Sequence, residues 1–401
     1  MRQSRHTISF DLIDPARHPD PDACEAWRTL RAEHPVAWCE PDGGRPGFWV
    51  LSRHQDITAI YRDTARLSSQ QGNMLSTLLT GGDAAGGLML VVTDPPRHTE
   101  IRRILQTGFS ARAMAHISES VRSATRNLMG AAVRAGGCDF ATDVAAQIPL
   151  IAICELLAVP TDDRPAMLEL TMTAMGADGS PESAEAASAA QGDILDYYSD
   201  LLEERRRAPG GDIVSLLATQ TIDGKPLTDA EVLLNCYNII IGGDETTRLS
   251  SAGAALAFIE HPDQWKRLKD DRGLLDTAIE EVLRWTTPAT HIGRTATADV
   301  TIRGCEIKAG DIVTVWNVSA NRDEEIFPDA YRFDISRTPN RHLTLGQGPH
   351  FCMGGALARV ELRMLLDELR TQVEELESAG PVERMKSSFL TGVSSLPVRL
   401  R

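Results

Sequence analysis

The sequence has a deficit of positive charge, few aromatic residues and no long apolar run. Lys and Arg number 41 against 56 Asp and Glu, so the formal net charge is −15. Nucleic acids and anionic membranes attract a positive field, so neither is expected as a partner. The most apolar stretch, Val144 to Val159, is interrupted by Gln147, Pro149 and Glu155 and is not expected to span a bilayer. Residues 1–20 contain no apolar core of signal-peptide length, and we expect a cytoplasmic protein.

Cysteine is present but follows no paired pattern. The seven cysteines are odd in number, scattered and never spaced as Cys-x-x-Cys. A disulfide framework and a zinc site are therefore not expected, and a reducing compartment is the natural location. The remaining composition, 42% hydrophobic and 24% charged, is that of an ordinary globular protein. The cysteines are Cys24, Cys39, Cys138, Cys154, Cys236, Cys305 and Cys352.

Helical patterning dominates from about Ala113 to Trp285, and short strand-like segments lie elsewhere. We expect a mainly α protein, a large helical body with small peripheral β-sheets, forming one domain over residues 1–401. Residues 68–90 and 174–190 are predicted to be mobile connections, because long loops in compact proteins often act as lids. The expected strands are Val36–Trp38, Phe48–Leu51, Val300–Ile302, Ile312–Val318 and Leu396–Leu400.

One long helix is predicted between Thr228 and Pro262. Thr228 and Glu231 have the spacing of a capping box, and the proline ends the helical pattern. Two adjacent glycines, Gly242 and Gly243, lie in its middle and each costs about 1 kcal/mol relative to Ala. They indicate either the close approach of a ligand to the backbone or a helix–helix contact through small residues.

A rigid loop precedes one of the cysteines. Residues 345–355 read Leu-Gly-Gln-Gly-Pro-His-Phe-Cys-Met-Gly-Gly and lead into a helical run, Ala356 to Arg370. Cys352 would lie at a helix start, where free N–H groups and the positive end of the helix dipole favour a thiolate. A single thiolate suits haem, whose porphyrin supplies the other ligands of the iron. The alternative is a buried structural cysteine beside a turn, which the glycine frame disfavours.

This stretch resembles the haem-binding loop of the cytochrome P450 superfamily, whose pattern is Phe-Gly-x-Gly-x-His-x-Cys-x-Gly. Leu345 stands where the family has Phe, which lies against the thiolate side of the haem. The matching positions are Gly346, Gly348, His350, Cys352 and Gly354.

Other segments resemble family motifs in the family's order. Glu281 and Arg284 resemble the Glu-x-x-Arg signature and share a helix face, with Arg332 expected as the third member of their ion-pair cluster. Residues 242–247 resemble the oxygen-activation motif, and residues 94–102 resemble the segment in which His and Arg hold a haem propionate. Together these matches imply the cytochrome P450 fold.

The resemblance implies haem b, iron protoporphyrin IX, with the thiolate of Cys352 as the axial ligand of the metal. Propionates are carboxylates and need cations or hydrogen-bond donors. The cofactor-binding residues that the resemblance implies are His98, Arg102, Arg294, His350, Gly346, Cys352 and Gly354.

The resemblance also implies roles in oxygen activation. Gly242 and Gly243 would let O2 lie against the long helix. Thr246 would hydrogen-bond to O2 or to a water and steer protons. Glu245 would feed that relay or hold its geometry, whereas Asp244 is expected to face solvent or a neighbouring helix.

The substrate pocket is expected to be apolar and to involve residues 68–90, 167–190, 237–243, 288–293 and 388–393. His291 is expected to pack near the haem edge and not to bind iron. The candidate substrate-binding residues are Met89, Ile239, Ala289, Thr290, Ile292, Phe389 and Leu390.

These expectations combine into a soluble bacterial haem-thiolate monooxygenase. It would take electrons from NAD(P)H through a ferredoxin reductase and a ferredoxin, and would oxidise a small molecule in secondary-metabolite biosynthesis. Three alternatives stay open: an acyl or aminoacyl substrate tethered to a carrier protein, oxidative coupling or ring closure, and a non-catalytic haem sensor. The ferredoxin is expected to dock near Cys352 on a local positive patch of Arg341, His342, Arg359 and Arg363.

Overall fold

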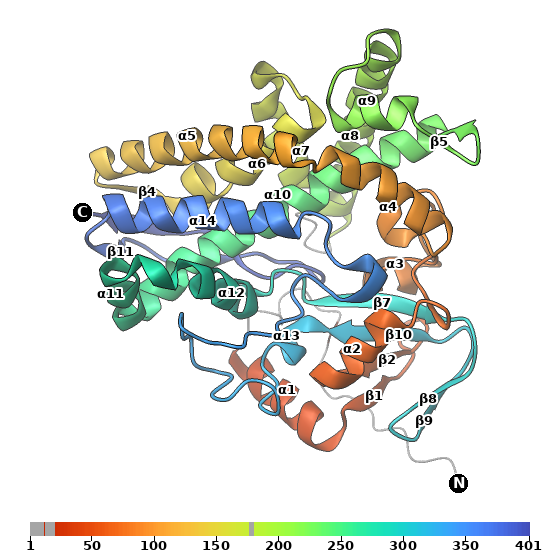
Figure 1. Cartoon of the computed structure of the whole chain (residues 1–401). Coiled ribbons are helices and arrows are strands. Elements are labelled where there is room, and N and C mark those ends of the chain that lie inside the picture. The colour runs from red at the N-terminus through yellow and green to blue at the C-terminus, as the bar shows by residue number, and fades with distance from the viewer. Residues whose placement is uncertain (1–11, 13–20, 176–179) are drawn as a thin grey trace.

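The computed structural model describes residues 12, 21–175 and 180–401. Its long helices pack into one large body, and the small sheets lie at its margins (Figure 1). This arrangement confirms the predicted mainly α architecture. The helices are α1 (Pro21–Glu33), α2 (His54–Arg62), α3 (Leu75–Leu79), α4 (Arg97–Gly108), α5 (Ala111–Ala135), α6 (Gln147–Leu157), α7 (Arg164–Met175), α8 (Pro181–Arg207), α9 (Ile213–Thr219), α10 (Asp229–Glu260), α11 (Pro262–Asp270), α12 (Leu275–Thr286), α13 (Asn317–Ala320) and α14 (Gly355–Gln372).

Local capping explains where the principal helices begin. The Thr228 side chain accepts from the N–H of Glu231, and the Glu231 carboxylate accepts from the N–H of Thr228, so the predicted capping box of α10 is confirmed. Ser110 caps α5, which ends at Gly136 in the left-handed region at φ 77°.

The segment 174–190 is more regular than predicted. Ser180 caps α8 by accepting from the N–H of Ser183, and Pro181 occupies the first turn. Residues 181–190 are therefore helical, their mobility stays a prediction, and residues 176–179 lie outside the described residues. Within the segment 68–90, Leu75–Leu79 form the short helix α3.

A five-stranded sheet has the order β1-β2-β10-β7-β3, with β10 parallel to β2 and the other neighbours antiparallel. Its strand β10 ends two residues earlier than predicted, because Asn317 begins α13. The strands of this sheet are β1 (Val36–Cys39), β2 (Phe48–Leu51), β3 (Leu67–Ser68), β7 (His291–Ala296) and β10 (Ile312–Trp316). The other strands are β4 (Gly137–Asp139), β5 (Thr221–Ile222), β6 (Lys225–Pro226), β8 (Val300–Ile302), β9 (Cys305–Ile307), β11 (Leu376–Ser378), β12 (Glu383–Arg384), β13 (Val393–Ser395) and β14 (Pro397–Leu400).

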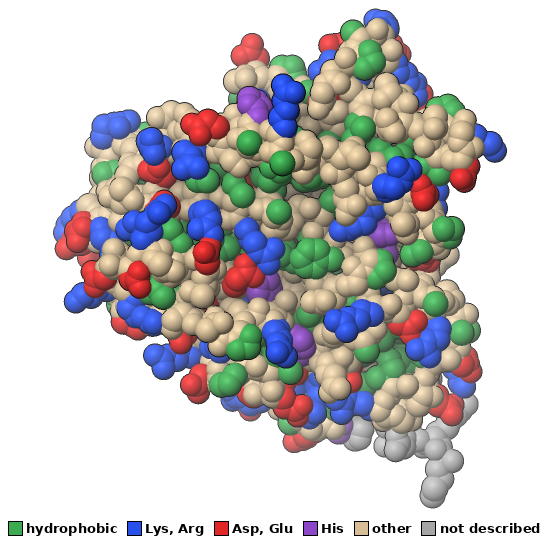
Figure 2. All heavy atoms as spheres, viewed as in Figure 1, with side chains coloured by type: hydrophobic (Ala, Val, Ile, Leu, Met, Phe, Trp, Pro, Cys, Tyr) green, Lys and Arg blue, Asp and Glu red, His purple; other side chains and the backbone are tan. Residues whose placement is uncertain are grey.

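Helix α10 lies at the centre of the helical body and packs against α6, α8, α12 and α14. One hydrophobic cluster includes residues from Leu90 to Leu400, so segments far apart in the sequence share this core. Within the described ranges, 21–175 and 180–401, no helix is both long and apolar enough to cross a bilayer. On the face that carries α5 and α14, acidic and basic side chains are interspersed (Figure 2).

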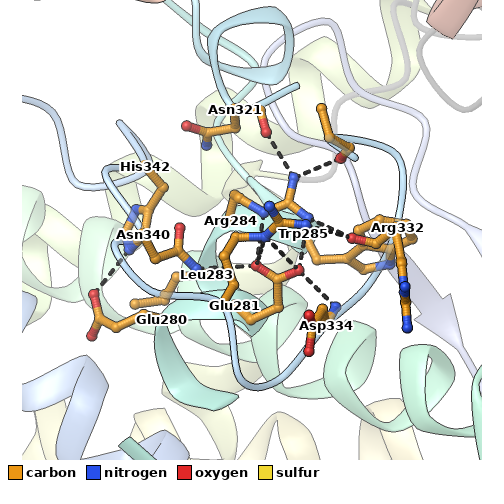
Figure 3. A network of polar contacts seen from close by, with 12 residues as sticks. Glu280, Glu281, Leu283, Arg284, Trp285, Asn321, Arg332, Asp334, Asn340 and His342 are labelled. Atoms are coloured by element: carbon orange, nitrogen blue, oxygen red, sulfur yellow. Dashed lines mark hydrogen bonds and ion pairs between the residues drawn. The ribbon is translucent and has the colours of Figure 1, made fainter. Parts of the chain in front are cut away.

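A buried ion pair joins two residues one turn apart on α12. Arg284 Nε and Nη2 donate to Glu281 Oε2 and Oε1, each at 2.7 Å, and both side chains are fully buried (Figure 3). The same guanidinium donates to the carbonyl oxygens of Asn321 at 2.9 Å, Ala330 at 2.8 Å and Arg332 at 3.0 Å. Through these hydrogen bonds, Arg284 holds the loop after α13 against α12.

The additional cation on Glu281 is Arg337, so the prediction of Arg332 was wrong. Arg337 Nε lies 3.1 Å from Glu281 Oε2. Arg332 contributes its carbonyl oxygen, and its side chain extends away from the Glu281 carboxylate (Figure 3). Both arginines belong to one irregular loop, and the path of that loop decides which guanidinium reaches α12.

The fastened loop also holds the segment that leads to Cys352. Asn321 Nδ2 donates to Thr344 Oγ1 at 2.9 Å, and the N–H of Leu343 donates to Asn321 Oδ1 at 2.7 Å. Thr344 Oγ1 in turn donates to the carbonyl oxygen of Leu283 at 2.7 Å. Residues 343–344 are thus tied to α12 both directly and through Asn321.

Replacing either arginine tests this correction. Arg337→Ala leaves Glu281 with one fewer buried cation and should lower the free energy of unfolding by about 3 kcal/mol. Arg332→Ala keeps the carbonyl oxygen and removes an exposed side chain, so the change should stay within about 0.5 kcal/mol. Urea unfolding of the two purified variants decides the matter. Equal destabilisation by both would contradict the assignment of Arg337.

Candidate active site

A cavity of about 280 Å³ lies between the middle of α10 and the loop before α14. Leu90, Phe109, Ile153, Ile239 and Ile292 contribute to its mainly apolar lining. The N-terminal half of α4, strand β7 and the loop with Cys352 add polar groups to one part of the wall. Such a lining suits an organic ligand that is oriented by a few polar contacts.

Close packing explains the glycines of the cysteine loop. Gly346 and Gly348 have φ values of 68° and 69°, in the region that favours glycine. A Cβ at Gly348 would lie 2.6 Å from the carbonyl oxygen of Tyr61, so a larger residue would push the loop off α2. The N–H of Cys352 donates to the carbonyl oxygen of Leu345 at 2.8 Å and closes the loop.

The thiol of Cys352 faces the cavity just before α14 begins. Cys352 is exposed, yet desolvation by the surrounding protein raises the pKa of its thiol above the ordinary value, against the N–H of Gly354 and the positive charges of Arg102 and Arg359, which lower it. A bound metal ion would deprotonate the thiol, and the three opposing groups would stabilise the thiolate.

Four basic side chains gather at the cavity: His98 and Arg102 from α4, Arg294 from β7, and His350 from the cysteine loop. The rings of His98 and His350 lie 4.2 Å apart between centroids. Burial, together with the nearby arginines, lowers the pKa of His98 to about 4 and that of His350 to about 2. Both rings are therefore neutral at pH 7 in this environment.

The basic set offers hydrogen-bond donors to an anion. His98 is buried, and neither of its ring nitrogens has a hydrogen-bond partner. The nearby carboxylate of Asp94 is engaged by the hydroxyl of Ser68 and by the N–H of Ser69. Buried polar groups without partners are uncommon in native proteins and often mark a missing ligand. Here they fit a ligand that carries carboxylate groups.

The two adjacent glycines of α10 have different surroundings. A Cβ at Gly242 would have no neighbour within 4 Å and would project into free space at the cavity wall. A Cβ at Gly243 would lie 2.3 Å from Ile153 Cδ1 on α6. Both interpretations of the sequence therefore apply, since Gly242 keeps the cavity open and Gly243 permits the contact between α6 and α10.

Thr246 lies on the cavity wall, one turn after Gly242. Its hydroxyl donates to the carbonyl oxygen of Gly242 at 2.9 Å, which leaves its lone pairs free to accept a hydrogen bond. A proton donor inside the cavity could therefore be held at Thr246 Oγ1.

Glu245 and Asp244 both lie on the buried side of α10. Glu245 is fully buried and bonds to Arg248 on the same helix, with Arg248 Nη2 2.6 Å from Glu245 Oε2. Asp244 is buried too, and its Oδ2 lies 2.7 Å from Thr171 Oγ1 of α7. Asp244 thus faces a neighbouring helix, one of the two alternatives expected, and the carboxylate of Glu245 is held by a cation.

Three of the substrate-binding candidates, Ile239, Ala289 and Ile292, line the cavity. Leu390 does not, because it is fully buried against Leu249 and Met385. The Thr290 hydroxyl donates to the carbonyl oxygen of Phe389, which ties the two segments together behind the wall. Met89 precedes two lining residues, Leu90 and Val91, without lining the cavity itself. Thr290 and Leu390 are buried, which corrects their prediction as lining residues, whereas Met89 and Phe389 are half-buried and their contact with substrate stays a prediction.

His291 is a core residue. Its Nε2 accepts from the N–H of Leu75 at 3.1 Å, and its ring stacks on Trp316 with centroids 4.6 Å apart. Because Nε2 is the acceptor, Nδ1 carries the proton and donates to Thr290 Oγ1 at 2.9 Å. Packing of His291 near the haem edge stays a prediction.

The expected positive patch is partly neutralised. Arg359 bonds to Glu280 through Nε at 2.6 Å and Nη2 at 2.9 Å, and His342 Nε2 lies 3.1 Å from the same carboxylate. Despite burial, these bonds lower the pKa of Glu280 to about 2. His342 is 8% exposed and Arg363 pairs with Asp276. His342 is therefore buried, and its prediction as a docking residue was wrong.

Sequence reasoning missed several cavity residues, including Phe109 and Ile153. Ile153 belongs to the most apolar stretch of the chain, which was considered only as a possible membrane span. Asn73 and Asn238 fall inside segments assigned to the pocket but were not singled out. The spacing of Arg248, three residues after Glu245, was a usable signal for an ion pair.

Comparisons with known proteins agree with this geometry. The family model described as Cytochrome P450 matches residues 180–371. Cytochrome P450 NovI of Streptomyces niveus is 47% identical over 391 residues, which cover 98% of this chain and 96% of the relative. Linalool 8-monooxygenase of Pseudomonas putida is 33% identical over 401 residues, covering 97% and 98%. The crystal structure of P450 OxyD, described as involved in the biosynthesis of vancomycin-type antibiotics, has a TM-score of 0.88 and 36% identity, covering 98% and 99%.

The different surroundings of the two glycines can be tested by matched substitutions. Gly243→Ala should destabilise the fold by about 1–3 kcal/mol, because its methyl group overlaps Ile153. Gly242→Ala should leave stability within about 1 kcal/mol, since its methyl group enters free space. In a double-mutant cycle, Ile153→Ala should cost less in the Gly243→Ala background than alone. Equal costs in both backgrounds would show that no contact limits Gly243.

Proposed function

Because the chain belongs to the cytochrome P450 family and is a cytochrome P450 monooxygenase, we propose that it binds haem b through Cys352 and oxidises a small organic molecule with electrons from a ferredoxin and its reductase. The observation that carries the assignment of the haem site is the combination of one thiol and four basic side chains on a single cavity. Secondary-metabolite biosynthesis is the proposed setting, supported by the similarity to OxyD.

The donor set fits haem on chemical grounds. Cys352 supplies a thiol that faces the cavity, and His98 supplies two buried ring nitrogens that have no protein partner. Arg102, Arg294 and His350 complete a set suited to two propionates. A Cβ at Gly354 would meet nothing within 4 Å, which leaves room beside the thiol. When bound, haem with a thiolate ligand supplies the chemistry of O2 activation.

The residues of α10 are proposed to prepare the cavity for this chemistry. Gly242 leaves space beside its carbonyl oxygen, and Thr246 Oγ1 accepts a hydrogen bond from a water or another donor there. This geometry would hold the proton of that donor at Thr246 Oγ1, beside the site of reaction. Glu245 lies next to Thr246 in the chain and is held by Arg248 in the structure.

The residues that line the cavity indicate which kind of substrate it would bind. Its apolar residues would exclude water from a hydrocarbon skeleton, and the half-buried Asn238 would offer an amide to one polar group. The proposed substrate is therefore a mainly apolar molecule with few polar groups. Supplying a free acid and the same acid bound to a carrier protein would separate a free substrate from a tethered one.

The test of function is turnover with a ferredoxin, its reductase and NADPH, using a substrate found by a spin-state shift. Product should form with an oxygen atom from labelled O2. Thr246→Ala should reduce the fraction of NADPH electrons recovered in product about tenfold, because the proton held at Oγ1 is lost. Thr219→Ala is the matched control, since Thr219 lies on α9 and its hydroxyl likewise donates to the carbonyl oxygen four residues earlier, that of Ser215. Unchanged coupling in Thr246→Ala would contradict the role of Thr246.

A second test concerns the docking of the ferredoxin. Arg341 is exposed and Arg363 is 40% exposed, whereas Arg359 belongs to the Glu280 cluster and is unsuitable for charge reversal. Phe351 is also exposed, at 38%, beside Cys352. Arg341→Glu with Arg363→Glu should slow reduction by ferredoxin several-fold at low salt and little at high salt. The control, Arg303→Glu with Lys308→Glu near the β8–β9 hairpin, should not change the rate; an equal effect of both pairs would exclude this docking surface.

A further inference from the structure

A buried acid cluster lies on the side of α10 that faces α7 and α14. We define it as Asp244, Glu245 and Arg248 of α10 with Glu361 of α14, and each is at most 3% exposed. Asp244 and Glu245 immediately precede Thr246, so this cluster adjoins the residue proposed to hold a proton in the cavity. The inference below rests on that proposed function and concerns how Glu245 becomes available to it.

The cluster contains three carboxyl groups but one guanidinium. Arg248 is committed to Glu245 through Nε at 3.1 Å and Nη2 at 2.6 Å, so this pair is electrically neutral. A second buried anion would have no matching cation, which is costly in a protein interior. Burial accordingly raises the pKa of Asp244 to about 7 and that of Glu361 well above its usual value.

The hydrogen bonds of Thr171 independently favour a protonated Asp244. Thr171 Oγ1 lies 3.0 Å from the carbonyl oxygen of Leu168 and 2.7 Å from Asp244 Oδ2. A hydroxyl has one proton and cannot donate to both oxygens fully. If Asp244 Oδ2 carries a proton, it donates to Thr171 Oγ1 and Thr171 donates to Leu168, which satisfies all three groups.

Two atoms of opposite character in the cluster have no hydrogen-bond partner. Asp244 Oδ1 and Arg248 Nη1 are both buried and unpartnered. Residues four apart in a helix share a face, so these side chains are neighbours. Arg248 is therefore within reach of a second carboxylate that it does not bind while Asp244 is neutral.

We propose that Asp244 is a positioning residue that acts through Arg248 on Glu245. With Asp244 protonated, Arg248 binds Glu245 and keeps that carboxylate on the buried side of α10. Loss of the Asp244 proton to solvent creates a carboxylate that draws Arg248 Nη1, and the bond between Arg248 and Glu245 weakens. Glu245 is then released to exchange protons with Thr246, the next residue.

The other groups that face Asp244 do not replace it in this role. Helix α6 contributes Cys154, whose thiol is kept neutral because burial raises its pKa to about 12. Helix α14 contributes Glu361, and α7 contributes the hydroxyl of Thr171. Because a neutral Asp244 holds Glu245 bound, proton delivery and coupling should increase as pH rises through about 7.

Infrared spectroscopy of the purified haem-loaded protein tests the protonation directly and needs no turnover. At pH 6 the wild type should show a carboxylic-acid carbonyl band that Asp244→Asn removes and Glu361→Gln does not, and the band should disappear with a midpoint near pH 7. Thr171→Val should move this band to higher wavenumber, because its O–H loses an acceptor. Absence of any band that responds to Asp244→Asn or Thr171→Val would overturn the proposal.

The pH profile of coupling provides the second readout. In the wild type, coupling should rise as the pH passes through about 7. In Asp244→Asn, whose amide mimics the neutral acid, coupling should stay at the low value across the pH range. A variant profile that rises as in the wild type would overturn the proposal. Should Asp244→Asn not fold, Thr171→Val still reports on Asp244 through its infrared band. Absence of product with an intact band would instead contradict the proposed function.

Discussion

The buried pair between Glu281 and Arg284 is the interaction on which the site depends most. It places a guanidinium where it can bind three carbonyl oxygens of the loop after α13, and Asn321 passes this restraint to the residues before Cys352. A buried ion pair contributes little net stability, because desolvation offsets its attraction. The pair instead fixes the position of residues 321–344, which contain no helix or strand and lead to Cys352.

Helix α10 has different chemistry on its two sides. Gly242 and Thr246 face the cavity, whereas Asp244 and Arg248 are buried toward the neighbouring helices. Glu245 lies between these sets in the sequence and joins the buried side through its bond to Arg248. The 3.6-residue period of the helix thus places Thr246 on the cavity side and the buried charged groups on the opposite side. The contact between Gly243 and Ile153 fixes the helix against α6 at the same level.

Local signals in the sequence predicted the capping box at Thr228, five of the fourteen strands in the described residues and the glycine frame around Cys352. Contacts between residues far apart in the sequence could not be predicted from such local signals. Whether Arg332 or Arg337 reaches Glu281 depends on the path of a loop, and residues five apart in an irregular segment give no preference. The burial of His342 and Leu390 likewise depends on packing against distant segments. Most of the cofactor and oxygen-activation residues that motifs identified lie at the cavity, with Glu245 as an exception, whereas pocket residues inferred from variable segments lie there only in part.

The most direct test of the account is the carbon monoxide difference spectrum of the purified, reduced protein. Ligation of haem by Cys352 predicts a Soret band at the position of thiolate-ligated haem, and the loss of this band in Cys352→Ala. A band at the imidazole-ligated position that persists under gentle preparation, or a protein that takes up no haem, would show that Cys352 is not the ligand.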